Sequence, residues 1–503
     1  MDKRSFKVIV VGGSIAGLTL AHSLDLAGID YIVLEKHSDP LATVGGSVGL
    51  LPNGWRILHQ LGLRQQLEQE AFPVKVAHMT YPDGFVFSDS FPAAIQERQV
   101  PRIRFPIGYM PANDERFGYS LSVLTRQQLI EVLYLGLRDK SKIKVGQRVI
   151  KIQHHQNRRG VSVFTESGQE HVGDLVAGAD GVHSITRSQM WLQLGQKLDV
   201  EKERRRRWKR YPHRVLLLIP RAEPGLVAEY SCVFGISSPL KGIPPGEQLI
   251  ACHDNATVLA FPGKDAHIGW GLIQKLNRPC NSPVTTQSLD GETALNMAKS
   301  AAGLGLYKDL KFHDLWVNTP KYSFTILEEG LFQIWHHGRI VCLGDSVSKM
   351  TPNMAQGANT AIEGAATLAN TLRKISQIDE PSEDDINLLL QGYTVRQQKR
   401  LRAVHAISRS VTRVHARQGR IKKIIGRYVY PYTPGAALHT FSRIIAPAPC
   451  LDYVPMPFPG PGWTRALVSE WSGISGVLLL VIPIIALVYG YNVAKFGGGS
   501  INN

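Results

Sequence analysis

Three residue types near the N-terminus have the spacing that a pyrophosphate and a ribose would need. Gly12 and Gly17 flank Ser14, and Glu35 follows about 20 residues after the glycine turn. A glycine turn that opens a helix offers backbone N–H groups and the positive end of the helix dipole to a pyrophosphate, and a carboxylate so placed accepts from ribose hydroxyls. Ser14 stands where the usual fingerprint has its middle glycine, and a serine still permits a close backbone approach. We therefore expect a dinucleotide site; the alternative is an ordinary strand–helix turn of a parallel sheet.

The pattern of apolar residues predicts the elements that position this turn. The β-branched run Val8–Val11 predicts a buried strand, a helical pattern extends from Ser14 to Leu24, and Tyr31–Glu35 predicts the next strand. The basic residues before the first run also suggest a signal peptide. We reject that reading because the run is short, is broken by glycine and lacks a convincing cleavage region.

Further segments carry candidate ligand-binding groups. Gly49 lies in a glycine-rich loop, which either lets the backbone approach a flat ring or is a plain connection. Arg126 stands at the start of a predicted helix, within reach of a phosphate or a sugar-alcohol chain. Asp180 follows a buried strand, where it either anchors a ligand or only forms a turn. A last buried strand, Ile340–Asp345, runs into a proline-bearing loop and a helix of small residues that begins near Gly357.

The middle of the chain predicts a second domain built on an antiparallel sheet, since 503 residues are too many for one ordinary core. Tyr230–Ile236, Thr257–Phe261 and Ile268–Leu272 have strand-like patterns separated by proline- and glycine-rich turns. Phe72–Phe91 alternates around a Pro-Asp-Gly turn and predicts a hairpin.

Composition and charge limit the class of protein. The hydrophobic fraction of 44% and the charged fraction of 19% are those of a globular protein. The five cysteines have no metal-ligand or redox-pair spacing, so we expect no metal site and a reducing compartment. The net charge of +16 is concentrated in Glu201–Arg210 and Val395–Arg427. Such runs suit nucleic acid, an anionic membrane surface or a solvated face.

The second basic run has apolar or small residues close to helical spacing, at Leu401, Val404, Ser408 (small), Val411 and Val414. This helix either lies against anionic headgroups or packs on the rest of the protein by its apolar stripe.

Ile474–Tyr491 carries no charge and is about long enough to span a bilayer. Aromatic residues flank it, the basic excess lies before it, and only Lys495 follows. By the positive-inside tendency, the large N-terminal part faces the cytosol. We expect one membrane-spanning helix near the C-terminus, in the endoplasmic reticulum, and a membrane rather than nucleic acid as partner; the alternative is a buried core helix.

Together these motifs resemble the class A flavin monooxygenases, whose fold is like that of para-hydroxybenzoate hydroxylase. The motifs are GGSIAG at 12–17 with Glu35, GADG at 178–181 and GDS…TPNMAQGAN at 344–359. Three finer stretches, GGSVGLLPNGWRIL, YSCVFGIS and KMTPNMAQGAN, are similar to fungal FAD-dependent monooxygenases of meroterpenoid and indole-diterpene pathways.

The resemblance implies an α/β fold, with a Rossmann-like FAD-binding domain, an interleaved antiparallel-sheet substrate domain, a C-terminal helical region and the transmembrane helix. We place the FAD-binding domain at 1–75, 117–190 and 311–375, the substrate domain at 76–116 and 191–310, the helical region at 376–472 and the transmembrane helix at 474–491. Compared with the family, Gln99–Asp114 and roughly Arg204–Gly225 look inserted, either as loops or as translated introns.

The resemblance also implies roles for individual residues. Glu35 would hold the adenosine ribose, Asp345 the ribityl or pyrophosphate part, and Tyr230 matches a tyrosine treated as an active-site residue, which makes it the candidate catalytic residue. The full set of implied FAD contacts is Gly12, Ser14, Gly17, Glu35, Gly49, Arg126, Asp180, Asp345, Gly357, Ala358 and Asn359. The family often has histidine where this chain has Ser348.

The activity implied is that of an FAD-dependent monooxygenase that consumes NAD(P)H and O2 and epoxidises an alkene of a prenylated secondary-metabolite intermediate through a flavin C4a-hydroperoxide. An alkene needs no general base, and the second domain contains no acid–base constellation. A phenol hydroxylase or an isoprenoid reductase on the same fold is the nearest alternative. A dehydrogenase would leave the later motifs unexplained, and a non-catalytic prenyl-binding chaperone like the GDP-dissociation inhibitors is a rival of another class.

Overall fold

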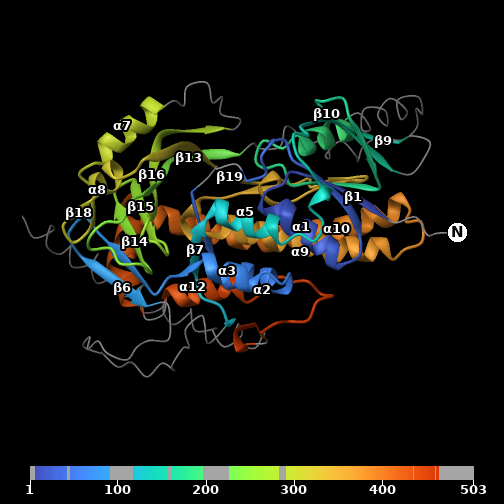
Figure 1. Ribbon diagram of the computed structural model, residues 1–503. Helices are drawn as coiled ribbons and strands as arrows, with labels where there is room; N and C mark the ends of the chain where they lie inside the picture. Colours follow the sequence, from blue (N-terminus) through green and yellow to red (C-terminus); the bar gives the residue numbers. More distant parts are fainter. Residues whose placement is uncertain are drawn as a thin grey trace, which may run out of the picture.

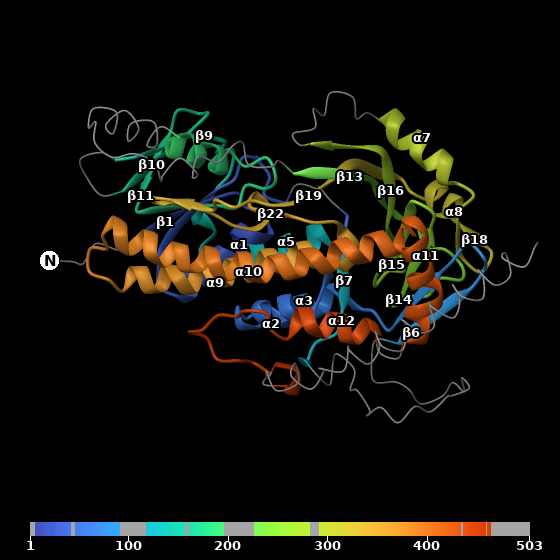
Figure 2. The ribbon, with the colours of Figure 1, turned by 180° about the vertical axis from the view of Figure 1, so that it is seen from behind.

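The computed structural model describes residues 6–41, 46–90, 117–155, 160–195, 226–281, 291–433, 436–458 and 460–463. The fold is built around two large sheets, which lie beside each other in Figure 1, the eight-stranded sheet at the left and the six-stranded sheet at the right. The long helix α10 (Glu383–His415) runs past both sheets, with α9 (Gln356–Ser376) beside it (Figure 2).

The six-stranded sheet has the order β20–β21–β12–β1–β2–β8, and its neighbours are parallel except for the pair β20·β21. Its first βαβ unit is β1, α1 (Ile15–Leu26) and β2, so the glycine turn lies at the carboxyl end of a central strand. The strands are β1 (Lys7–Val11), β2 (Asp30–Leu34), β8 (Ile143–Lys144), β12 (Leu175–Gly178), β20 (His336–His337) and β21 (Ile340–Cys342).

The eight-stranded sheet has the order β22–β19–β13–β16–β15–β14–β5–β6 and is antiparallel except for the pair β14·β5. Alternate side chains of a strand point to opposite faces. Val233 and Leu272 therefore pack under α7 (Gly291–Ala301) and α8 (Phe312–Val317), while Cys232 and Ile273 face the opposite side. The strands are β5 (Val76–Thr80), β6 (Val86–Ser90), β13 (Val227–Ser237), β14 (Glu247–His253), β15 (Ala256–Pro262), β16 (Ile268–Asn281), β19 (Lys321–Leu331) and β22 (Ser348–Lys349).

Smaller elements connect and cover these sheets. Three small sheets consist of β3 (Ser47–Leu50), β7 (Ser122–Thr125) and β4 (Phe72–Pro73), of β9 (Val149–His154), β10 (Val161–Thr165) and β11 (Glu170–Gly173), and of β17 (Gly305–Tyr307) and β18 (Leu310–Lys311). The remaining helices are α2 (Pro52–Gln60), α3 (Arg64–Glu70), α5 (Arg126–Leu135), residues 185–195, α11 (Gly419–Ile424) and α12 (Ala436–Ile445). Short turns of helix are η1 (Lys140–Lys142), η3 (Gly344–Ser346), η4 (Pro352–Met354), the π-turn η5 (Ile425–Val429), η6 (Tyr430–Tyr432) and η7 (Pro461–Trp463).

The α/β architecture with C-terminal helices agrees with the prediction, and the three strands expected in the second domain are β13, β15 and β16, paired antiparallel. The predicted interval 311–375 divides between the sheets, because β19 joins the eight-stranded sheet while β21 joins the six-stranded one. Both expected insertions and the expected membrane span at 474–491 lie outside the described residues. Among the helices of the described ranges, none combines the length and the apolar character that a bilayer crossing requires.

Candidate cofactor and substrate site

A cavity of about 910 Å³ lies between the two large sheets. Its volume is near the upper end of the range for small-molecule sites. One wall comes from the carboxyl ends of β1, β2 and β12, from the start of α5, and from the segment between η3 and α9. The other wall comes from β13, β15, β16 and β19. The cavity therefore joins the predicted dinucleotide site to the predicted substrate domain.

The glycine turn after β1 has room for backbone only. Gly12 has a φ of +104°, and a Cβ atom there would lie 2.5 Å from the carbonyl oxygen of Ala179. A Cβ atom on Gly17 would lie 1.9 Å from the carbonyl oxygen of Gly12, so Gly17, which does not line the cavity, is needed for packing. Ser14 is the N-cap of α1 but its side chain makes no capping bond, which leaves first-turn N–H groups for a ligand. This turn fits the pyrophosphate of a dinucleotide.

Arg126 and Ser14 form a pair on the cavity wall. Arg126 Nη2 donates to Ser14 Oγ at 2.7 Å, and both residues line the cavity. The arginine is held at the first position of α5, where Thr125 and Gln128 form a capping box. Burial lowers the pKa of Arg126, while Asp345 and Glu35 act in the opposite direction. The serine that replaces the middle glycine is thus a hydrogen-bond partner of the arginine predicted to contact the cofactor.

Glu35 lies at the end of β2, buried and on the cavity wall. Its Oε2 accepts from the N–H of Gly13 at 2.7 Å, and its Oε1 accepts from the N–H of His37 at 2.9 Å. These two bonds fix the carboxylate, and each oxygen keeps a further lone pair for a ribose hydroxyl.

Asp180 forms the turn that its sequence context allowed, and its role as a ligand anchor stays a prediction. Its carboxylate accepts from the Ser184 hydroxyl at 2.5 Å and from the N–H and hydroxyl of Thr186, each at 2.9 Å. These bonds form the turn that leads into the helix at 185–195, and Asp180 also lines the cavity.

Asp345 lies in η3, lines the cavity and forms an ion pair with Lys349, which also lines it. The sequence prediction named the acid and missed the lysine. The only signal for Lys349 is its spacing of four residues from Asp345, a spacing that brings side chains together on a helix and is uninformative in a loop.

The start of α9 points a helix N-terminus at the cavity. Ala355 precedes it with a φ of +51°, in the left-handed region, and makes no side-chain cap. Gly357 and Ala358 then line the cavity. The N–H groups of a first helical turn have no partner within the helix, and the dipole there is positive. This arrangement can stabilise negative charge on a bound ring, as predicted for this helix.

Asn359 has a different position from the one predicted, because it lies behind the cavity wall and does not line it. Its side-chain amide donates to the carbonyls of Gly49 and Ala355 at 2.8 and 2.6 Å, and its oxygen accepts from the N–H of Leu51 at 3.0 Å. It joins β3 to the start of α9 and so positions Gly49, which does line the cavity.

A buried ion pair lies one turn further along α9. Glu363 is fully buried and accepts from Arg400 Nε and Nη2 at 2.9 and 2.8 Å, and from Asn53 Nδ2 at 2.6 Å. The sequence analysis missed this cluster, because its members come from α2, α9 and α10 and share no local pattern.

Tyr230, the candidate catalytic residue, is not among the described residues that line the cavity. It is fully buried on β13, and its hydroxyl donates to Gln418 Oε1 at 3.2 Å. Burial raises its pKa to about 12, against an opposing effect of Arg413. Cys232 and Phe234 line the cavity from the same face of β13, and Tyr230 lies further along that face, next to a bulge at Ala228. Its catalytic role stays a prediction.

The wall formed by β13, β15, β16 and β19 is apolar. Among the described residues of that wall, Cys232 is the one titratable group, and burial raises its pKa to about 12, so it stays a neutral thiol. The lining side chains are those of Cys232, Phe234, Leu259, Phe261, Trp270, Ile273, Thr325 and Leu327. Such a wall suits a hydrocarbon ligand and provides no base.

Comparisons with known proteins agree with this geometry. The chain matches the family model of the FAD binding domain over residues 5–206 and 313–383. It is 90% identical over 503 residues to the FAD-dependent monooxygenase sdgC of Emericella nidulans, covering 100% of both chains. It is 40% identical over 495 residues to the FAD-dependent monooxygenase paxM of Penicillium paxilli, covering 97% of this chain and 96% of that one. HpxO of Klebsiella pneumoniae, solved with FAD and uric acid, has the same fold, with a TM-score of 0.65 at 19% identity over 88% of this chain and 97% of that chain.

Proposed function

This chain belongs to the FAD-dependent monooxygenases with the FAD binding domain, and from this premise we propose that it epoxidises an alkene of a prenylated small molecule. FAD is the cofactor, and NAD(P)H and O2 are the co-substrates. The observation that carries the proposal is the apolar wall, whose one titratable group among the described residues is a neutral thiol. A phenol hydroxylase gains from a base that ionises its substrate, whereas an alkene needs none.

The chain's residues bind, orient and shield in this proposal. The glycine turn and α1 hold the pyrophosphate, Glu35 accepts from the ribose, and Arg126 with Asp345 contacts the chain between them. The first turn of α9 directs N–H groups at the flavin ring and stabilises its negative charge. When bound, FAD supplies the oxygen-transfer chemistry, and the apolar wall orients the prenyl chain and excludes water.

The experiment is incubation of the enzyme with NADPH, ¹⁸O2 and a farnesylated or geranylgeranylated aromatic. We expect one labelled oxygen in an epoxide of the prenyl chain. A matched reaction with ordinary O2 in ¹⁸O-labelled water should give an unlabelled epoxide. Label on the aromatic ring, with the alkenes intact, would identify a phenol hydroxylase and overturn the proposal. Reduction of an alkene to a saturated chain would identify a reductase instead.

We further propose that residues 474–491 anchor the enzyme in the endoplasmic reticulum membrane, with the catalytic part in the cytosol. The support is the uncharged run itself, together with the excess of basic residues before it and the single Lys495 after it. A prenyl chain gains about 0.8 kcal/mol for each buried CH₂, so the substrate concentrates in the membrane.

Truncation before Gly473 should move the protein from the membrane to the soluble fraction with its FAD retained. A full-length control with Leu480→Arg and Ile484→Arg should also leave the membrane, because each central arginine costs about 2.5–3.5 kcal/mol. Loss of FAD and unfolding of the truncated protein would instead identify 474–491 as a core helix.

A further inference from the structure

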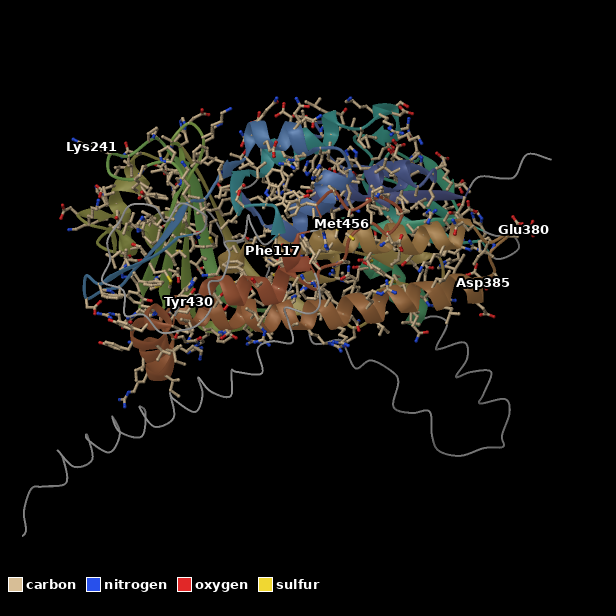
Figure 3. The ribbon with its side chains drawn as sticks, turned by 90° about the horizontal axis from the view of Figure 1, so that it is seen from below. Phe117, Lys241, Glu380, Asp385, Tyr430 and Met456 are labelled. Carbon is tan, nitrogen blue, oxygen red and sulfur yellow. The ribbon has the colours of Figure 1, made fainter. Side chains whose placement is uncertain are left out.

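The segment at residues 419–432, formed by α11, η5 and η6, exposes large apolar side chains that lie close together in the chain. Ile421 is 74% exposed, Tyr428 61% and Tyr432 66%, and Ile424 and Ile425 are also exposed. Elsewhere in the described residues, an element exposes at most two large apolar side chains, as α10 does with Leu388 and Val395. Figure 3 shows this part of the chain projecting beyond α10 at the end of the molecule where Tyr430 is labelled.

The sequence alone could not separate this segment from α10, which it follows. In α10 the apolar stripe is used for packing, because Leu401, Val404 and Ser408 are buried. Arg413 of α10 is also engaged, since it forms ion pairs with Glu229 and Glu329 at 2.9 Å. For α10, packing on the rest of the protein is therefore the correct alternative. The apolar side chains of 419–432 remain directed outward.

The segment is basic and firmly held. Residues 417–432 contain five cations and no acid. Arg417 and Lys423 pair with Asp254 at 2.9 and 2.6 Å, and Arg427 pairs with Asp83 at 2.8 Å. The two acids leave a local charge of +3. These pairs tie the segment to the turns after β14 and β5, so its outward side chains have a fixed direction.

We infer that residues 419–432 dock on an anionic lipid surface. Isoleucines beside lysine and arginine are the pattern of a helix that lies in the membrane interface, where tyrosine is also favoured. Each basic residue near an anionic bilayer strengthens binding roughly fivefold. The inference rests on the membrane location proposed above, and it adds the face that the catalytic part turns toward the lipid.

This face belongs to the substrate side of the molecule. Tyr430 packs in the same apolar clusters as Phe261, and Phe261 lines the cavity. Docking through 419–432 would therefore hold the apolar wall, rather than the dinucleotide wall, nearest to the bilayer in which a prenyl chain dissolves.

Hydrogen–deuterium exchange of the full-length holoenzyme tests this docking. The protein is reconstituted in phosphatidylcholine vesicles that contain or lack phosphatidylserine. We expect slower amide exchange across 419–432 when phosphatidylserine is present, and no change at residues 149–154 of β9, at the opposite end of the molecule from α11 in Figure 2. Equal exchange on both vesicles would overturn the inference. Protection that rises with protein concentration without lipid would also overturn it and would identify an interface between copies.

Variants of the basic and apolar side chains show which of them the lipid contact requires. Replacing Arg420 and Lys422 by glutamine should reduce the lipid-dependent protection roughly fivefold for each residue. Ile421→Ser with Tyr428→Ser should abolish it, while the matched control Leu388→Ser with Val395→Ser, two exposed apolar residues of α10, should retain it. Epoxide formation in the same samples is scored separately, so a failure of the proposed reaction is distinguishable from a failure of docking.

Discussion

At the scale of single residues, the cofactor wall is held by its own hydrogen bonds. Glu35 accepts from two backbone N–H groups, Ser14 accepts from Arg126, and Asp345 is paired with Lys349. A ligand therefore meets groups whose directions are already fixed, which reduces the entropy lost when it binds.

Replacing Glu35 or Asp345 by alanine should weaken FAD binding. A hydrogen bond to a charged group contributes on the order of 1.5–3 kcal/mol, or roughly 10- to 150-fold in affinity. Fluorescence titration of the apoprotein with FAD measures the change, and Glu35→Gln and Asp345→Asn keep the shape and serve as controls. An alanine variant with the affinity of the unmodified protein would mean that its carboxylate does not contact the cofactor.

At the scale of elements, the join between β3 and α9 matters most for the cavity. Asn359 makes three hydrogen bonds there, to Gly49, Leu51 and Ala355. It holds the loop at Gly49 against the N-terminus of α9, and both of these segments line the cavity.

Asn359→Ala should lower the free energy of unfolding by about 2–4 kcal/mol, because it leaves buried backbone groups without partners. It should also weaken FAD binding. Asn370→Ala is the matched control: Asn370 lies on the same helix, donates to the Cys450 carbonyl at 2.8 Å and accepts from the Asp452 N–H at 3.1 Å. The control should lose stability in urea yet bind FAD normally; equal FAD affinity in both variants would contradict the role of Asn359.

The ion pair of Glu363 and Arg400 joins α9 to α10, and both side chains are buried. Removing one partner of a buried pair costs about 3–5 kcal/mol, since the other charge is left in the interior. Glu363→Gln should therefore destabilise the protein strongly, and adding Arg400→Met should recover part of the loss. Urea unfolding curves measure both, and a double variant no more stable than Glu363→Gln would argue against the pair.

Elements with local patterns were predictable from the sequence, and contacts between distant elements were not. The glycine turn, β1, α1, β2 and the start of α9 follow from apolar periodicity and glycine placement within short stretches. Tyr230 shows the limit: alternation places it on the same strand face as Cys232, yet only the arrangement of strands decides which of the two reaches the cavity. The role of Asn359 was hidden because its partners lie in another segment, near Gly49.

At the scale of the whole molecule, α10 connects the two sheets. His405 of α10 bonds to Ser348 at 2.8 Å, and Thr412 bonds to Thr351 at 2.6 Å. Ser348 is the position where the family often has histidine. In this chain the imidazole of His405 reaches the same loop from α10. Because Lys349, Met350 and Thr351 line the cavity, α10 supports the cavity wall from behind.

Buried histidines should make the protein sensitive to mild acid. Burial lowers the pKa of His415 to about 4 from the ordinary 6.5, and burial also lowers the pKa of His336 to about 4. Between about pH 4 and pH 6.5, these histidines bind protons in the unfolded chain but not in the folded chain, so the free energy of unfolding falls as the pH falls. Each such histidine contributes a slope of at most about 1.4 kcal/mol per pH unit.

The Tm should fall as the pH is lowered from about 7 to about 5, and the Tm of the His415→Gln variant should fall less steeply. An exposed-site control, His313→Gln, should leave the slope unchanged. Identical slopes for all three proteins would show that His415 does not stay neutral in the folded state.

The two walls of the cavity come from different strands, and this separation affects how such a chain can change over evolution. Leu259 and Leu327 shape the apolar wall and lie on strands that contribute nothing to the dinucleotide wall. Substitutions there alter which hydrocarbon fits while the glycine turn and its carboxylate remain as they are. New substrates are therefore accessible by mutation in the strands of the apolar wall, at little risk to the cofactor chemistry that the dinucleotide wall preserves.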